Sequence, residues 1–323
     1  MSRSGEAVAD VSDAPRITIV TPSFNQAPYL ETTIRSVLDQ GYPNLEYVVI
    51  DGGSTDGSVD ILRKYADHLA FWVSEPDSGQ THAINKGMAR ATGTLRGYLN
   101  SDDIYLPGAL ERVASAYREA PEADLFHGAC RVIDEQGRTI GRRCASITRF
   151  DEIVDVWGVW WKQRNFVQPE VFWTKRIADK IGPFQTDLFM VMDYEYWTRI
   201  LRAGGQVATV EEELAAFRIT STQKSNQHER SAMEMLGVVQ KLIWDSTAPI
   251  PWATRLRLQA NWLYQTRFLP EISASVADGE PRWRRLVGGL GCAVRHPKLV
   301  LSDDYRRRVL GAVIGPRGDE STR

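Results

Sequence analysis

Strand and helix patterns alternate along the first hundred residues of this chain. The segment RITIVTPSF (16–24) is rich in β-branched residues, and residues 29–40 place apolar side chains on one stripe of a helix. A second strand, loop and helix follow at 45–66, and the strand at 70–75 leads through a helix at 81–91 to the strand at 94–100. This alternation predicts an α/β fold with a mostly parallel sheet and helices on both faces.

The length predicts more than one structural unit. The 323 residues exceed the roughly 250 to 300 residues at which a single hydrophobic core stops growing. We therefore expect an α/β domain over residues 15–225, where the strand and helix patterns lie. Residues 226–323 carry amphipathic helical patterns and are predicted to form a helical C-terminal extension. Residues 1–14 are small, polar and of mixed charge, which predicts a disordered leader.

Charge and cysteine content restrict the partners and the compartment. A formal net charge of −2 and a pI of about 6.3 provide no overall basic field, so no nucleic acid partner is predicted. Three cysteines lie far apart in the sequence without C-x-x-C spacing, which fits a reducing cytoplasm. Neither a secretory signal pattern nor a run of roughly 18 apolar residues occurs. We expect a cytoplasmic protein that is at most peripheral on the inner face of the cell membrane.

Polar segments follow each of the four predicted strands. They are TPSFN (21–25), DGGSTDGS (51–58), EPDSGQ (75–80) and NSDD (100–103). In open α/β sheets the loops at the carboxyl ends of the strands gather along one edge, where ligands bind. The four segments are therefore predicted to converge on one crevice.

The segment Asn100-Ser101-Asp102-Asp103 is the sharpest chemical signal. Magnesium and manganese prefer oxygen ligands and commonly take one or two protein carboxylates, with phosphates and water in the remaining positions. The alternative is that Asp102 or Asp103 caps the following turn and helix. In the second segment, the side chain of Asp51 is placed to accept hydrogen bonds from a base edge or a ribose, and the adjacent glycines allow close backbone approach.

Residues 17–110 and 166–202 resemble the inverting family-2 glycosyltransferases with the GT-A fold. The most specific match is TPSFNQAPYLETTIRSVLDQGYPNLEYVVIDGGSTDGS (21–58). The resemblance implies a GT-A, Rossmann-like domain that binds a nucleotide diphosphate sugar with Mn2+ or Mg2+. It assigns the nucleotide to Thr21, Pro22, Ser23, Asn25 and Asp51. It maps the D-x-D metal motif onto Asn100, Ser101 and Asp102, with Asp103 close by as a second metal contact.

Two further groups of donor contacts follow from the resemblance. In the loop after the third strand, the resemblance assigns donor contacts to Asp77 and Gln80. The alternative for this segment is that it caps the next helix. After the last strand, Arg218 and Lys224 are predicted phosphate clamps, because relatives have basic groups there that close over the diphosphate. His228 is predicted to lie at the surface. The Asn at position 100 departs from the family's Asp and removes one negative charge beside the sugar.

The general base is predicted to be Asp193. An inverting transfer is one displacement, so a single carboxylate must take the proton of the acceptor hydroxyl. The resemblance places this group in the segment MDYEYW (192–197), where Asp193 and Glu195 point to different sides of a helix. Glu195 stands four residues before Arg199, the order of an exposed ion pair, and is kept as a weak acceptor contact. A plain N-cap is the alternative for Asp193.

Weaker candidates for the acceptor site come from residues 157–170. The aromatic faces of Trp160 and Trp161 suit the apolar faces of sugar rings, and Gln168 lies in a stretch similar to the family's acceptor side. The alternative is that these aromatic rings fill the core.

The sequence predicts a non-processive hexosyltransferase in surface polysaccharide or glycolipid synthesis, by analogy with the family. The donor is predicted to be a UDP-sugar, because UDP is the commonest nucleotide for such enzymes, and the acceptor a glycan or glycolipid. The absence of a Q-x-x-R-W motif indicates a single addition, and the absence of G-x-G-x-x-G after the first strand argues against an oxidoreductase. A non-catalytic nucleotide-sugar or glycan binding module is the alternative. The arginine-rich tail fits either peripheral membrane contact or solvated helices.

Overall fold

The computed structural model describes residues 14–221, 223–224 and 227–314. The chain divides into two compact units, one formed by residues up to 153 and 158–234, the other by 154–157 and residues from 235 onward. The division falls inside helix α8 (His228–Trp244), whereas the sequence places the end of the α/β domain at residue 225. Almost all of the predicted leader, residues 1–13, lies outside the described residues.

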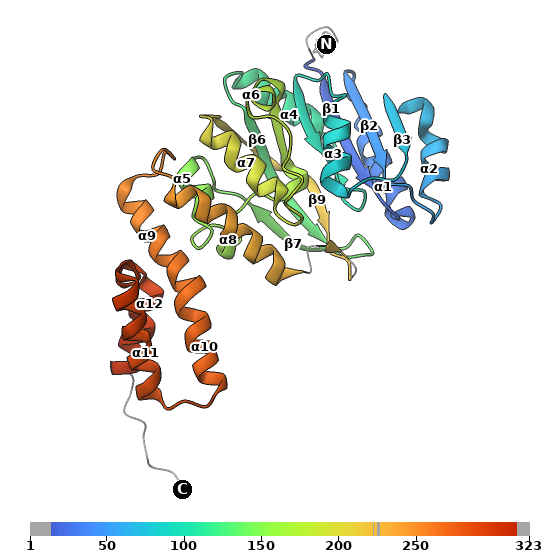
Figure 1. The fold of residues 1–323 in the computed structure, drawn as a ribbon. Helices are drawn as coiled ribbons and strands as arrows, with labels where there is room; N and C mark the ends of the chain where they lie inside the picture. The colour runs from blue at the N-terminus through green and yellow to red at the C-terminus, as the bar shows by residue number, and fades with distance from the viewer. Residues whose placement is uncertain (1–13, 222, 225–226, 315–323) are drawn as a thin grey trace, which may run out of the picture. The chain divides into compact units, whose positions relative to one another are not determined.

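The first unit is built on a mixed sheet whose amino-terminal half is parallel (Figure 1). Strands β1 (Ile17–Ser23), β2 (Leu45–Asp51), β3 (Phe71–Ser74) and β4 (Leu95–Tyr98) lie in the order β3-β2-β1-β4, and all their pairings are parallel. The predicted α/β fold is therefore confirmed for this half. Because these strands run in one direction, their carboxyl ends lie at one edge.

Beyond β4 the sheet continues with mostly antiparallel pairings. The order is β4-β8-β6-β9-β5, with β8 (Val171–Thr174) antiparallel to both neighbours and β6 (Leu125–Ile133) parallel to β9 (Val207–Arg218). The short β5 (Ile104–Tyr105) pairs with β9, and β7 (Thr139–Cys144) pairs with β6. The long strand β9 pairs with β5, the short strand that follows the aspartate segment.

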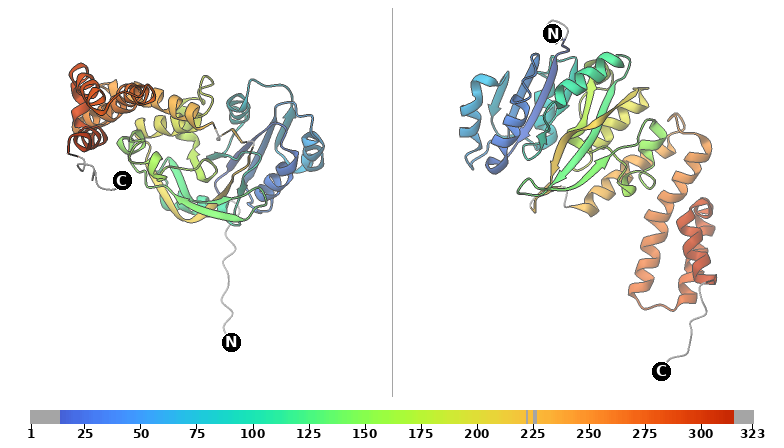
Figure 2. Two further views of the ribbon diagram at one scale, coloured as in Figure 1. Left: turned by 90° about the horizontal axis from the view of Figure 1, so that it is seen from below. Right: turned by 180° about the vertical axis from the view of Figure 1, so that it is seen from behind.

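Helices cover both faces of this sheet (Figure 2). Alternation along β1 explains the two layers, since Ile17 and Ile19 belong to the core with α1 (Ala27–Leu38) and α4 (Ala109–Glu119), and Val20 meets α3 (Gln80–Met88) on the other face. A Cβ at Gly87 of α3 would clash with Val20, so glycine permits this close approach. The other α-helices of the first unit are α2 (Ser58–Tyr65), α5 (Phe150–Val154), α6 (Lys175–Ile181) and α7 (Met192–Arg202).

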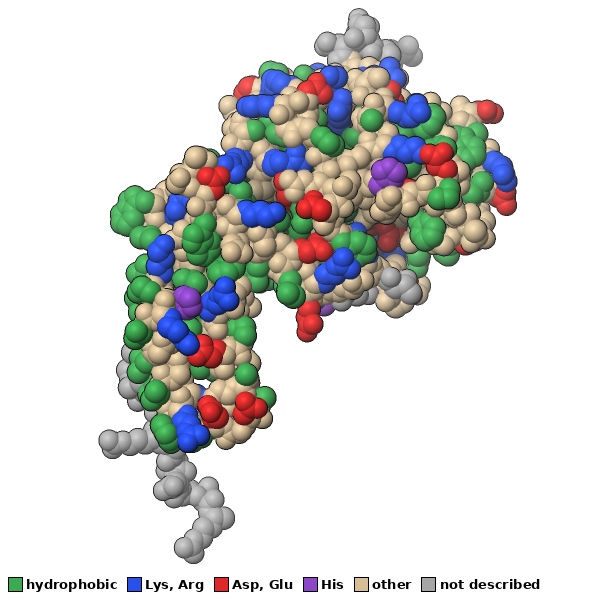
Figure 3. Space-filling view, in the orientation of Figure 1, with side chains coloured by type: hydrophobic (Ala, Val, Ile, Leu, Met, Phe, Trp, Pro, Cys, Tyr) green, Lys and Arg blue, Asp and Glu red, His purple; other side chains and the backbone are tan. Residues whose placement is uncertain are grey.

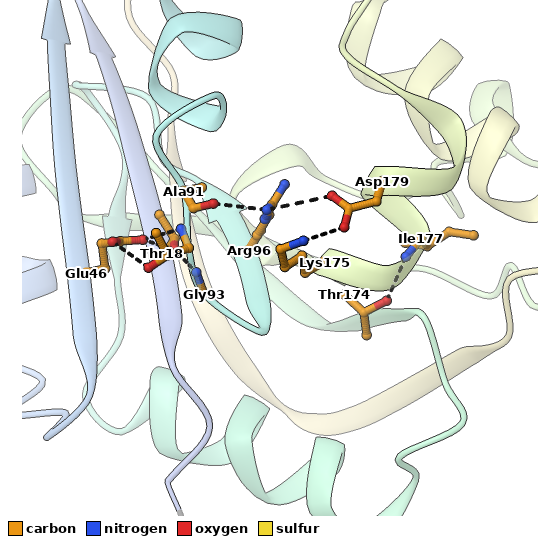
Figure 4. A network of polar contacts seen from close by, with 10 residues as sticks. Thr18, Glu46, Ala91, Gly93, Arg96, Thr174, Lys175, Ile177 and Asp179 are labelled. Atoms are coloured by element: carbon orange, nitrogen blue, oxygen red, sulfur yellow. Dashed lines mark hydrogen bonds and ion pairs between the residues drawn. The ribbon is translucent and has the colours of Figure 1, made fainter.

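A polar network fastens the strands at their amino ends (Figure 4). Glu46 on β2 accepts hydrogen bonds from the hydroxyl of Thr18 on β1 and from the backbone N–H of Thr92. Arg96 on β4 donates to the carbonyl of Ala91 at 3.0 Å. Buried charges are stable only when they are paired or hydrogen-bonded, so this network fixes the strands at the end opposite the polar loops.

The second unit is helical. Helix α9 (Trp252–Leu263) continues through a π-helical turn (Tyr264–Phe268) into α10 (Leu269–Ala277), and α11 (Arg282–Arg295) and α12 (Asp303–Ile314) follow. Phe268 packs edge-on against Tyr305 of α12, and Cys292 of α11 is buried. Within the described part of the chain, none of the helices combines the length and apolarity needed to cross a membrane.

Candidate active site

A cavity of about 690 Å³ lies at the carboxyl ends of the parallel strands. All four polar segments that follow these strands contribute to its wall. The predicted site residues that line it are Pro22, Ser23, Asp77, Gln80, Asn100, Ser101, Asp102, Gln168, Asp193 and Lys224. The predicted residues outside the lining are Thr21, Asn25, Asp51, Asp103, Trp160, Trp161, Glu195 and Arg218.

The first two loops are tied to each other below the cavity. Asp51 is fully buried and accepts hydrogen bonds from the hydroxyl of Ser74 at 2.6 Å and the N–H of Ser54 at 2.8 Å. Asn25 accepts a hydrogen bond from the N–H of Thr55 with its side-chain oxygen. Thr21 points into the core, where its hydroxyl lies 3.0 Å from the hydroxyl of Tyr47. These side chains hold the loops in place, and their contact with a nucleotide stays a prediction.

A directional chain of hydrogen bonds crosses the cavity floor. Lys224 Nζ donates to Gln80 Oε1 at 3.0 Å, and Gln80 Nε2 donates to Asn100 Oδ1 at 2.7 Å. Asn100 Nδ2 donates to Gln168 Oε1 at 2.9 Å, and Gln168 Nε2 ends the chain at the carbonyl oxygen of Tyr98 at 2.6 Å. An ammonium can only donate and a carbonyl can only accept, so the two ends fix the orientation of all three amides.

The aspartate pair separates into one cavity residue and one buried residue. Asp102 lines the cavity, and burial raises the pKa of its carboxyl while Arg218 lowers it. Asp103 is 1% exposed, and its Oδ1 accepts a hydrogen bond of 2.8 Å from the backbone N–H of Arg218. Burial, followed by the charge of Asp102, raises the pKa of Asp103 well above its usual range. The structure therefore differs from the predicted metal contact of Asp103, because its carboxyl faces the protein interior.

Few protein side chains are available as ligands for a metal ion. Within residues 14–221, 223–224 and 227–314, no group of three or more His, Cys, Asp or Glu side chains is placed to hold an ion. The single carboxylate of Asp102 fits a magnesium or manganese ion that receives its other ligands from phosphate oxygens and water.

Arg218 does not lie in the cavity wall, which differs from its prediction as a phosphate clamp. It is 5% exposed at the end of β9. Its guanidinium donates to the carbonyl oxygen of Asp102 at 2.8 Å and to those of Asp134 and Glu135 at 3.2 Å. Five guanidinium N–H donors in a fixed fork suit this role, so Arg218 joins β9 to the aspartate turn. Lys224 is the predicted cation that does line the cavity.

Helix α7 directs its two acidic residues to different surroundings. Asp193 lies in the cavity wall, and burial raises the pKa of its carboxyl to about 6. Glu195 is 7% exposed and pairs with Arg199 at 2.7 Å, so this ion pair is partly buried and not exposed as predicted. The helical spacing separates the two carboxylates, and only Asp193 is in reach of a ligand.

Comparison with known proteins shows the family of this chain. Residues 18–187 match the model of the family described as glycosyl transferase family 2. The chain belongs to this family. The putative teichuronic acid biosynthesis glycosyltransferase TuaG of Bacillus subtilis is 37% identical over 117 residues, which cover 35% of this chain and 46% of that protein.

Solved structures share the fold of the glycosyltransferase. The mannosyltransferase PcManGT of Pyrobaculum calidifontis, in complex with GDP-Man and Mn2+, has a TM-score of 0.60 and 22% identity, over 99% of this chain and 92% of that one. Residues 1–349 of TarS from S. aureus, in complex with UDP-GlcNAc, have a TM-score of 0.63 and 16% identity, over 93% and 92% of the two chains. At this level of identity the likeness establishes the GT-A fold alone.

The aromatic residues predicted to bind the acceptor lie outside the cavity. Trp160 packs edge-on against Tyr194 and stacks on Trp197, with ring centroids 4.9 and 6.4 Å apart. Trp161 is 42% exposed and does not line the cavity. The structure thus places Trp160 in the alternative role of core packing against α7 of the glycosyltransferase.

An apolar wall of the cavity was missed from the sequence. Phe189, Met190 and Met192 line the cavity immediately before Asp193, and the backbone N–H groups of Phe189 and Met190 both donate to Glu234 Oε2. The ring of Phe189 also lies 4.0 Å from Lys224 Nζ. The run FMVM directly before an acidic helix start is the signal that could have indicated this wall.

Proposed function

We propose that this glycosyltransferase moves one sugar from a nucleotide diphosphate sugar, a UDP-sugar, to a hydroxyl acceptor with inversion at the anomeric carbon. The observation that carries the proposal is that Asp102 and Asp193 line one cavity. A carboxylate for a metal and a carboxylate for a proton are the two acidic groups that such a transfer requires.

The donor occupies the side of the cavity formed by the first three loops. Ser23, Gly52 and Asp77 lie together there, and a Cβ at position 52 would come within 2.9 Å of Asp77 Oδ2. The glycine thus leaves room for a flat ligand beside the carboxylate. Cavities of roughly 300 to 1,000 Å³ hold small ligands of this kind, and the 690 Å³ here falls in that range. PcManGT and TarS, which share the fold, were solved in complex with GDP-Man and with UDP-GlcNAc.

Asp102 would hold Mn2+ or Mg2+ together with the diphosphate of the donor. The ion supplies neutralisation of the negative charge that develops on the leaving diphosphate. Lys224, which donates the first hydrogen bond of the amide chain, adds a second positive charge at the cavity. The Mn2+ present in the PcManGT complex supports manganese as the first ion to test.

Asp193 acts as the general base. The acceptor oxygen attacks the anomeric carbon, the bond from that carbon to the diphosphate oxygen breaks, and the hydroxyl proton passes to the carboxylate of Asp193. Burial raises the pKa of this carboxyl to about 6, so it is ionised at neutral pH but is a stronger base than an exposed aspartate. The apolar side chains of Phe189, Met190 and Met192 line the cavity beside this carboxylate.

The acceptor belongs to surface polysaccharide or glycolipid synthesis. TuaG is named for teichuronic acid biosynthesis, and relatives from Mycobacterium tuberculosis and Mycobacterium bovis are named for PGL/p-HBAD biosynthesis. Gln168 is the remaining acceptor-side candidate that lines the cavity, since Trp160, Trp161 and Glu195 lie elsewhere.

The test is a screen of nucleotide sugars by thermal shift, with and without MnCl2, followed by measurement of nucleoside diphosphate release. One sugar nucleotide is expected to raise the melting temperature only with metal, because a ligand that binds the folded state stabilises it by mass action. Asp193→Asn should keep this shift and lose turnover. Donor binding without nucleoside diphosphate release by the wild type, even with candidate acceptors, would instead indicate a binding module.

A further inference from the structure

Helix α11 (Arg282–Arg295) exposes an apolar stripe on one face. Trp283, Val287, Leu290 and Val294 are 62%, 61%, 49% and 83% exposed. Their spacing of four, three and four residues places all four on one side of the helix. Exposed apolar residues are normal when scattered, but a continuous stripe of them marks an interaction surface.

The opposite face of α11 is already packed. Cys292 is buried at 1% exposure, the carbonyl of Gly289 accepts a hydrogen bond of 3.1 Å from the hydroxyl of Tyr305, and a Cβ at position 289 would lie 3.0 Å from the ring of Phe268. The helix is therefore held in its unit by one side. Its exposed stripe is not needed for the packing of that unit.

Basic residues accompany the stripe. Residues 282–308 contain eight Lys or Arg and two Asp, although the whole chain has a formal net charge of −2. No acidic residue occurs within α11, and the guanidinium of Arg284 lies 5.4 Å from the ring centroid of Trp283. In Figure 3 hydrophobic and basic side chains lie together over the C-terminal helices, with some acidic side chains among them.

We propose that the stripe of α11 docks the enzyme on an anionic lipid bilayer. A helix with aromatic and aliphatic residues on one face and arginines beside it lies in the membrane interface, with its apolar face at the acyl boundary and its cations among the headgroups. Arginine and tryptophan side chains suit this position because each has an apolar body and a polar end.

The charge distribution favours lipid over a second copy of the chain. Arg284 lies against the ring of Trp283 in the stripe, whereas Arg295 pairs with Glu271 at 2.6 Å. A two-fold contact through this stripe would place positive charge of both copies at one interface. An anionic surface attracts these groups instead. The proposal concerns the helical unit alone and does not rest on the chemistry proposed for the cavity.

Flotation of the full-length protein with lipid vesicles tests the proposal. Wild-type protein should float with vesicles of phosphatidylcholine and phosphatidylglycerol, and remain at the bottom with phosphatidylcholine alone. Trp283→Glu with Val287→Glu should reduce the floated fraction about tenfold, since it places charge in the apolar face. Trp283→Phe with Val287→Ile should float like the wild type.

Trp252→Glu is the matched control, because Trp252 is 77% exposed at the start of α9, outside the stripe. It should float like the wild type, and all variants should keep the wild-type melting temperature and release of nucleoside diphosphate in solution. The proposal is overturned if the Glu double variant floats normally or if wild-type protein binds neither vesicle. It is also overturned if sedimentation without lipid shows a dimer that the double variant abolishes.

Discussion

Lys224 and Gln80 are 144 residues apart in the chain, and the ammonium of the first donates a hydrogen bond of 3.0 Å to the side-chain oxygen of the second. This contact joins the segment after β9 to the start of α3. It also sets the direction of the amide chain that runs through Asn100 to Gln168. The family's aspartate at position 100 could accept from Gln80 but could not donate to Gln168.

Asn100→Asp should therefore destabilise the enzyme. The substitution leaves two acceptor oxygens facing each other where Asn100 and Gln168 now share a hydrogen bond of 2.9 Å. We expect the free energy of unfolding to fall by about 1–2 kcal/mol, measured by urea denaturation at pH 7.5. Gln136→Glu, at an exposed turn, adds the same charge and should change the stability little. Equal stabilities of the two variants would contradict the fixed direction of the chain.

Asp193→Asn should remove the proton acceptor and leave the donor site intact. Loss of general-base catalysis lowers the transfer rate by about 10²- to 10⁴-fold, while donor affinity measured by calorimetry should stay within a factor of two to three, roughly. In the wild type, kcat should rise with pH through about 6, because the carboxylate must be ionised to act as base. Asp187→Asn, at an exposed position six residues earlier, is the control. Unchanged turnover of Asp193→Asn would remove this assignment.

The same carboxyl should make stability depend on pH. Burial raises the pKa of Asp193 to about 6, above its value in the unfolded chain, so its contribution favours folding at low pH and is lost as pH rises through about 6. Asp193→Asn should thus gain about 1–3 kcal/mol relative to wild type between pH 4 and pH 7.5. Chemical denaturation of both proteins at the two pH values measures this difference. A constant difference would show that the carboxyl titrates normally.

Asp102 and Asp103 should respond differently to the same substitution. Asp102→Asn removes the carboxylate proposed to hold the metal and should raise the Mn2+ concentration for half-maximal activity at least about tenfold. Asp103→Asn should leave that concentration unchanged, because its carboxyl faces the backbone of Arg218 and not the cavity. Manganese titrations of both variants at saturating donor make the comparison. A large shift for Asp103→Asn alone would reverse the assignment.

Arg218 and Lys224 should likewise separate stability from donor binding. Arg218→Met removes the guanidinium hydrogen bonds to the backbone carbonyls of Asp102 and Glu135, and should lower the free energy of unfolding by about 1–3 kcal/mol. Lys224→Met should weaken donor binding about tenfold with a smaller change in stability, since Lys224 lines the cavity. Thermal unfolding measures the stability of both variants, and calorimetry measures their affinity for the sugar donor. The opposite pattern would restore Arg218 as a phosphate clamp.

The alternation of strands and helices predicted the parallel half of the sheet and the edge at which the cavity lies. This worked because hydrophobic periodicity is a local property and the ends of parallel strands meet by geometry. The pattern weakened after β4, where short strands such as Val171–Thr174 pair antiparallel. The strands with which they pair are distant in sequence, so no local period indicates these pairings.

From the sequence alone one could identify segments that line the cavity, namely the four polar loops and the acidic start of α7. Which side chains of these segments face the cavity could not be read from the sequence. Asp102 and Asp193 lie in its wall, whereas Asp103, Glu195 and Arg218 are buried in contacts with the protein. The physical reason is that the direction of a side chain in a loop depends on hydrogen-bond partners from remote segments, which a single sequence does not specify.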